Sequence, residues 1–206
     1  MTRLLGGRDT DRMDALSDGL FAIVLTLLIL QFEVPTVAPE ELPAALADQG
    51  PLLFSYLLSF LVVGLYWIVH HNLFQQIVRH DRLLLWLNLA FLLTVSFLPY
   101  PTEILGLYGT RFAWTLYASN IVLVGITLTA IWTYAARAGF LADEIDEFTA
   151  RAVTIRGLIA PAVFLLSIGA AVVSVTLAFF VPLLIAPLQA LWVRRYRGRR
   201  GPGDLE

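Results

Sequence analysis

The chain consists of long apolar runs separated by short polar segments. A helix needs about 20 apolar residues to cross a bilayer, and most of these runs approach that length. The last stretch, Gly157–Trp192, would form a single helix of about 54 Å, which is too long for one crossing, so we expect a turn near Val173–Ser174. The pattern therefore predicts six membrane-spanning helices, over residues 15–34, 52–71, 83–98, 112–136, 157–173 and 175–192.

Prolines affect two of these predictions. Pro99 and Pro101 end or kink the third helix, which we expect to stop at Leu98 or to continue to Leu105. Pro182 falls inside the sixth helix, where neighbouring helices must satisfy the carbonyl group that it frees.

Composition assigns the chain to the membrane proteins. Of its 206 residues, 58% are hydrophobic and 15% are charged, with a mean hydropathy of +0.76. Soluble domains carry about 25% charged residues. The absence of cysteine excludes disulfides and thiolate metal ligands. We expect one all-α, six-helix domain with a basic tail over residues 193–206. The amino-terminal run lacks the features of a cleavable signal peptide.

The arginines predict an orientation. All 14 basic residues are Arg, and all except Arg111 flank the helices on one face of the predicted membrane domain. Positively charged loops are retained in the cytoplasm. We therefore expect a multi-pass plasma-membrane protein with both termini cytoplasmic and with the C-terminal arginines near anionic lipid headgroups.

A polar cluster leads directly into the first helix. Asp18 lies at the apolar boundary, where an unpaired carboxylate costs several kcal/mol, so it is a candidate functional residue. Arg12 and Asp18 are about 240° apart around a helix, so each needs partners on neighbouring helices. The topology places Asp18 at the depth of polar residues on helices two and three, namely His70, His71, Asn72, Asp81 and Asn88.

The first helix also carries a stripe along one face. Its members follow i, i+4, i+7, i+8, i+11 spacing and are Gly19, Ile23, Thr26, Leu27 and Leu30. Judged on its residues alone, such a stripe is more typical of helix packing or of a lipid-facing surface than of a pore.

The region 12–30 resembles the transmembrane protein 175 family of potassium channels. That family opens its first helix with R-x-x-x-F-S-D-G, followed by an F-A-I-x-x-T-L-L-type run. The matching positions are Arg12, Ser17, Asp18, Gly19, Phe21, Ala22, Ile23, Thr26, Leu27 and Leu28. Leu16 stands where the family has Phe, an apolar exchange that affects local packing. Residues 97–102, FLPYPT, also resemble the family's helix-three ending. The resemblance covers helices one to three, and the later helices match in hydropathy and number alone.

The resemblance implies a pore lined by helix one in a homotetramer, because a single helix one cannot enclose a pore. Carried over by position, the constriction consists of Ile23, Thr26 and Leu30, with Leu27 adjacent. Rings of branched apolar side chains gate such a pore by dewetting, and Thr hydroxyls replace part of the water around the ion. The implied function is passive potassium conduction without a TVGYG filter.

The resemblance further implies that Arg12, Ser17 and Asp18 tie helices one to three together at the cytoplasmic side. We expect His71 to be the histidine partner, and Asn72 and Asn88 to complete this polar network. A packing clamp is the favoured role. Ion coordination, or proton sensing through a histidine, is the alternative.

Two other classes of protein stay open. A secondary transporter would need broken helices around a mid-membrane site, whereas a non-conducting scaffold subunit would need only packing. No enzyme is expected, since the chain has no HExxH, GxSxG or Walker motif. Residues 106–109, GLYG, are expected to form a turn rather than an ion filter. The expected partners are potassium ions, identical subunits and lipid, without a cofactor, a resident metal or a nucleic acid.

Overall fold

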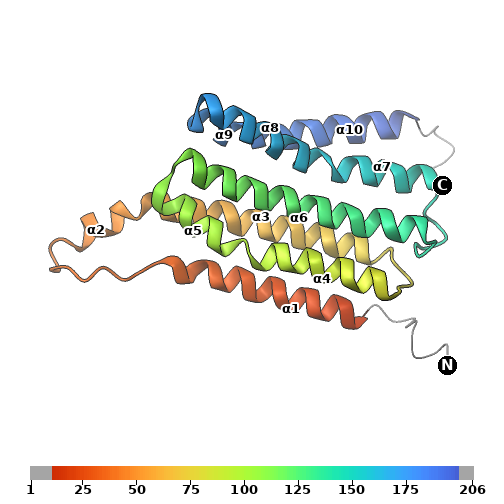
Figure 1. Ribbon diagram of the computed structural model, residues 1–206, viewed down its shortest axis with the longest axis horizontal. Coiled ribbons are helices and arrows are strands. Elements are labelled where there is room, and N and C mark those ends of the chain that lie inside the picture. The colour runs from red at the N-terminus through yellow and green to blue at the C-terminus, as the bar shows by residue number, and fades with distance from the viewer. Residues whose placement is uncertain (1–10, 200–206) are drawn as a thin grey trace.

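The computed structural model describes residues 11–199 as a bundle of long helices that share one axis (Figure 1). In chain order the elements are α1 (Asp11–Leu27), the 3-10 turn η2 (Leu28–Gln31), α2 (Leu42–Asp48), α3 (Gly50–Phe74), α4 (Arg82–Ser96), α5 (Pro99–Tyr108), α6 (Arg111–Arg137), α7 (Glu147–Gly157), α8 (Ile159–Val173), α9 (Val175–Phe180), the 3-10 turn η3 (Val181–Leu184) and α10 (Ile185–Arg199).

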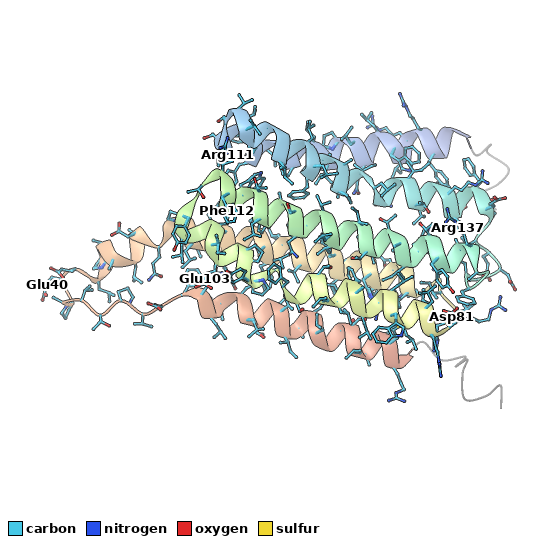
Figure 2. The ribbon with its side chains drawn as sticks, in the orientation of Figure 1. Glu40, Asp81, Glu103, Arg111, Phe112 and Arg137 are labelled. Carbon is cyan, nitrogen blue, oxygen red and sulfur yellow. The ribbon has the colours of Figure 1, made fainter. Side chains whose placement is uncertain are left out.

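Six segments within residues 11–199 are long and apolar enough to cross a bilayer. They are Arg12–Gln31, Gly50–Phe74, Arg82–Tyr108, Arg111–Arg137, Glu147–Val173 and Val175–Tyr196. The prediction of an all-α chain with six membrane-spanning helices is therefore confirmed. The start of α1 and the end of α10 lie at the same end of the bundle, which we call the arginine-rich end (Figure 1). Asp81 and Arg137 lie at this end, and Glu40, Glu103 and Arg111 lie at the other (Figure 2).

The first span is displaced toward the N-terminus, at Arg12–Gln31 instead of the predicted 15–34. Its α-helical part ends at Leu27, and η2 then tightens the chain, with Gln31 Nε2 donating to the Leu28 carbonyl at 2.6 Å. Phe32 is extended, so the expected end at Val34 is wrong. Pro35 would also disfavour helical backbone at Val34, the residue before it.

The third span is longer than the predicted 83–98. After α4 the chain continues into α5, and the apolar span reaches Tyr108. Pro99 is accommodated because it falls in the first turn of α5, where a backbone N–H is not required. α3 likewise extends the predicted 52–71 at both ends and begins with Pro51 in its first turn.

The fifth span begins ten residues before the predicted Gly157, at Glu147. Asp146 caps α7 by accepting a hydrogen bond from the Thr149 backbone N–H at 2.7 Å, which allows a helix to start within the acidic segment. α7 and α8 together make the span that ends at Val173.

The predicted turn between spans five and six lies at Ser174, which has extended backbone. Its hydroxyl accepts a hydrogen bond from the Leu177 backbone N–H and caps α9. The sixth span is not one regular helix, because Pro182 lies in η3 between α9 and α10. The loop between spans one and two also contains the short helix α2, which the sequence pattern did not predict.

The GLYG segment departs from the expected turn. Gly106–Tyr108 completes α5, and only Gly109 leaves the helix, with a left-handed φ of +55° that ends it. Gly106 permits a close approach to α3, since an added Cβ would lie 2.5 Å from Ser55 Oγ. These glycines serve helix ending and helix packing.

The core is centred on α6, which packs against α4, α5 and α8. Its inward side chains include Trp114, Tyr117 and Ile131, all fully buried. α1 packs against α3 and α4 on one side of the bundle, whereas α10 packs against α7, α8 and η3 on the other (Figure 1). This arrangement leaves the outer face of α1 without a neighbouring element among residues 11–199.

Candidate pore-lining face and polar network

One face of α1 is embedded in the core and the opposite face is exposed. The embedded side chains are Met13, Ser17, Phe21, Val24 and Leu28. The predicted stripe lies on the exposed side, where the exposed fractions of Ile23, Leu27 and Leu30 are 59%, 42% and 72%, and Thr26 is also exposed. The structure therefore brings the four predicted constriction residues together on one exposed face of the described bundle.

Thr26 presents its hydroxyl oxygen from this face. The hydroxyl donates to the Ile23 carbonyl of its own helix, at 2.8 Å, and also lies 3.2 Å from the Ala22 carbonyl. A hydroxyl has one proton and two lone pairs, so the oxygen keeps acceptor capacity after this donation. Thr26 can thus offer an oxygen ligand to a cation without giving up its helix bond.

The change from α1 to η2 aligns the two leucines. In a 3-10 helix the side chains at i and i+3 eclipse each other, in contrast to the α-helical offset. Leu27 is the cap residue of η2 and Leu30 lies three residues later. Both leucines therefore remain on the exposed side that carries Ile23.

A directional hydrogen-bond chain joins α1, α3 and α4 in the core. His70 Nε2 lies 3.2 Å from Asn88 Oδ1, and Asn88 Nδ2 donates to Ser17 Oγ at 3.1 Å. Ser17 in turn donates to the Met13 carbonyl at 2.9 Å. All three polar side chains are buried. This arrangement requires the His70 tautomer that carries its proton on Nε2.

Aromatic rings enclose His70. Its imidazole is stacked on Phe74 and Phe91, with ring centroids 3.9 and 5.3 Å apart, and Phe21 of α1 is tilted against it at 5.9 Å. The histidine in the buried network is therefore His70 and not the predicted His71. The two positions differ by about 100° around α3, and the packing of the aromatic rings decides which of them faces inward.

Asp18 has a separate partner. Trp67 Nε1 of α3 donates to Asp18 Oδ1 at 2.8 Å, and the Trp67 ring is stacked on His71 at 5.9 Å. His71 Nε2 is hydrogen-bonded to Gln75 Nε2 at 2.9 Å and not to Asp18. Asp18 is bonded across helices, as expected, but it is exposed in the single chain.

The remaining predicted network residues lie outside these contacts. Arg12 and Asn72 are exposed at the arginine-rich end, and Arg12 forms no ion pair within residues 11–199. Sequence reasoning missed Trp67 as a partner of Asp18. A signal was available, because an indole N–H needs an acceptor and Trp67 lies one turn before His71, at the depth of Asp18.

Asp81 links α4 to α6 at the arginine-rich end. Its carboxylate caps α4 through the Leu84 backbone N–H at 2.9 Å and accepts a short hydrogen bond from Tyr134 of α6. Desolvation alone would raise the pKa of Asp81, but the hydrogen bonds from Tyr134 and the backbone lower it below its ordinary value. No group of three or more His, Asp or Glu side chains able to hold a metal ion occurs in the described part of the chain.

Comparison with known proteins identifies the family. Residues 12–99 match the model of the Endosomal/lysosomal potassium channel TMEM175 family. A potassium channel of Streptomyces collinus is 38% identical over 176 residues, covering 82% of this chain and 85% of the relative. A potassium channel of Chamaesiphon minutus is 31% identical over 191 residues, covering 89% and 94%.

The same fold occurs in a crystal structure described as a lysosomal potassium-selective channel TMEM175 homolog from Chamaesiphon minutus. It superposes with a TM-score of 0.75 at 28% identity and covers 91% of this chain and 97% of that chain. The fold is thus that of a multi-pass helical membrane channel and not of an enzyme. The chain belongs to the TMEM175 family.

Proposed function

We propose that this protein is a potassium channel whose pore is lined by the exposed face of α1 in a homotetramer. The observation that carries the proposal is that face itself, on which Ile23, Thr26, Leu27 and Leu30 are exposed in the described part of the chain while the opposite side of α1 is buried. Relatives described as potassium channels that align over most of the chain support it.

The mechanism follows from the chemistry of this face. Copies of Ile23, Leu27 and Leu30 around an axis form apolar rings that exclude water when narrow and admit an ion after a small widening. Thr26 oxygens between the rings replace part of the ion's hydration shell. The Ile23-to-Leu30 separation is about 12 Å when the larger rise of η2 is included, slightly more than a regular α-helix gives.

In this proposal, the polar residues position α1 and do not bind the ion. Asp18 lies about 140° around α1 from Ile23, on the side that meets Trp67 of α3. The Ser17–Asn88–His70 chain fixes the rotation of α1 against α3 and α4. The arginine-rich end faces the cytoplasm, and the membrane is the plasma membrane.

The test is ion flux through the purified protein in liposomes, together with its native mass in detergent. A tetramer with large unitary potassium currents supports the proposal. Saturable, coupled flux would indicate a secondary transporter, and the absence of flux from a folded assembly would indicate a scaffold. A purely monomeric protein would contradict the shared pore.

A further inference from the structure

A groove between α8 and α10 is lined by one face of each helix and has a volume of about 570 Å³. α8 contributes Ile159, Ala162, Val163 and Leu166, which follow i, i+3, i+4, i+7 spacing. α10 contributes Leu188, Leu191, Trp192 and Arg195 with the same spacing. The groove is therefore lined by two facing helical stripes. Ala162, which has a small side chain, lies in the α8 wall.

The groove is polarised along its length. α10 ends toward the arginine-rich end (Figure 1), so Arg195 is the α10 lining residue nearest that end and Leu188 is the deepest. α8 is separated from that end by α7, so its lining residues, from Ile159 to Leu166, lie further into the bundle. Seven residues of helix span about 10.5 Å, which is less than one leaflet of about 15 Å. The lining of α10 is thus apolar over part of one leaflet and ends at a guanidinium. Trp192, next to that end, is of the residue type enriched at the headgroup level.

The charge around this end favours an anionic headgroup. Arg195 is exposed, and it forms no ion pair with any residue between 11 and 199. Arg194 is its exposed neighbour. A phosphate would therefore meet positive charge where the apolar lining ends.

The groove is also on the side of the bundle that faces lipid in the proposed assembly. α1 packs against α3 and α4, and α8 and α10 lie across the bundle from it (Figure 1). With α1 turned toward the pore axis, the α8–α10 face is turned outward.

We propose that this groove is a binding site for an anionic phospholipid of the leaflet at the arginine-rich end. One acyl chain lies between α8 and α10, and the phosphate is bound by Arg195. The site goes beyond the channel function, and its occupancy is measured without ion flux, so failure of either proposal is separately visible.

The test uses the purified full-length protein, delipidated in detergent and incubated with equal amounts of phosphatidylglycerol and phosphatidylcholine that carry identical acyl chains. Native mass spectrometry then counts the lipids retained per chain. We expect selective retention of phosphatidylglycerol. Arg195→Gln should reduce that retention about fivefold, as expected for the loss of one arginine near an anionic headgroup. The adjacent Arg194→Gln is the matched control and should change it by less than about twofold.

A second pair of variants tests the apolar part. Ala162→Trp places a ring inside the groove and should release both lipids, whereas Leu165→Trp adds the same ring to α8 outside the groove and should release neither. Leu166→Trp replaces Ala162→Trp if that variant fails to assemble. Three results would overturn the site: equal losses for the two arginine variants, equal retention of the two lipids, or no lipid on the unmodified chain because a second copy covers the groove.

Discussion

Asn88 of α4 donates a hydrogen bond to the hydroxyl of Ser17 of α1 across 3.1 Å, and both side chains are buried. Seventy-one residues separate the two positions in the chain. The bond is the middle step of the chain from His70 to the Met13 carbonyl, so Asn88 connects α4 to both α1 and α3. In an apolar core, a polar side chain that loses its partner retains its desolvation penalty, which makes this contact a sensitive point of the fold.

Ser17→Ala should lower the thermal stability of the detergent-solubilised protein, because it leaves the buried Asn88 amide without its acceptor. The expected loss is about 1–3 kcal/mol. Ser96→Ala is the control, since the exposed Ser96 hydroxyl bonds only to the Leu93 carbonyl of its own helix. Equal unfolding midpoints for the two variants would mean that the three-helix chain does not stabilise the protein.

Trp67→Phe should separate the hydrogen bond to Asp18 from ring packing on His71, because it removes the indole N–H and keeps an aromatic ring. We expect a smaller loss of stability than for Ser17→Ala, since Asp18 is exposed to solvent, together with lower flux as α1 loosens. Trp86→Phe, on an exposed α4 side chain, controls for loss of indole surface. Normal flux in Trp67→Phe would argue against a positioning role for Asp18.

Ile23→Asn should raise potassium conductance several-fold in liposome or bilayer recordings, because a polar ring removes the dewetting barrier of an apolar constriction. Leu165→Asn is a matched control, with an exposed fraction of 56% compared with 59% for Ile23, on a helix across the bundle. Unchanged conductance in assembled Ile23→Asn would remove Ile23 from the constriction.

Thr26→Val should reduce discrimination between potassium and sodium while leaving assembly intact, since it keeps the shape of the side chain and deletes the oxygen. The measurement is the reversal potential in mixed potassium–sodium gradients. Thr127→Val is the control, because the Thr127 hydroxyl likewise donates back to its own helix but lies on α6, against Thr94 of α4. If Thr127→Val shifted the reversal potential as much as Thr26→Val, the effect of Thr26→Val would be indirect.

Tyr134→Phe should destabilise the protein at neutral pH and have little effect in acid. The Asp81 pKa is lowered in the folded state, with hydrogen bonds from Tyr134 and the backbone outweighing desolvation. Its stabilising contribution is present above the unfolded pKa of about 3.9 and is lost as the pH falls through the folded value. Thermal unfolding should be measured from pH 7 down to pH 3. The difference in unfolding midpoint between wild type and variant should shrink as the pH falls. A difference in midpoint that does not depend on pH would mean that the tyrosine acts through packing alone. Tyr108→Phe, at the other end of the bundle, is the control and should leave the midpoint unchanged.

The polar network in the structure differs from the predicted one in ways that the sequence pattern could not show. The sequence placed His70 and His71 at the correct depth, but the choice between them depends on how α3 is rotated against Phe74 and Phe91. Trp67 became a partner of Asp18 through the same rotation. Depth follows from position along a helix, whereas direction follows from three-dimensional packing.

By itself, the sequence determined that this chain is a helical membrane protein with six spans, because the length of an apolar run is set by the thickness of the bilayer. Its first-helix motif also pointed to the TMEM175 family, to which the chain belongs. Only the tertiary structure decided where α1 tightens into η2, which side of it is buried, and that α8 and α10 leave a groove ending at Arg195. These features depend on contacts between residues far apart in the chain, whose energies no local pattern of polar and apolar positions records.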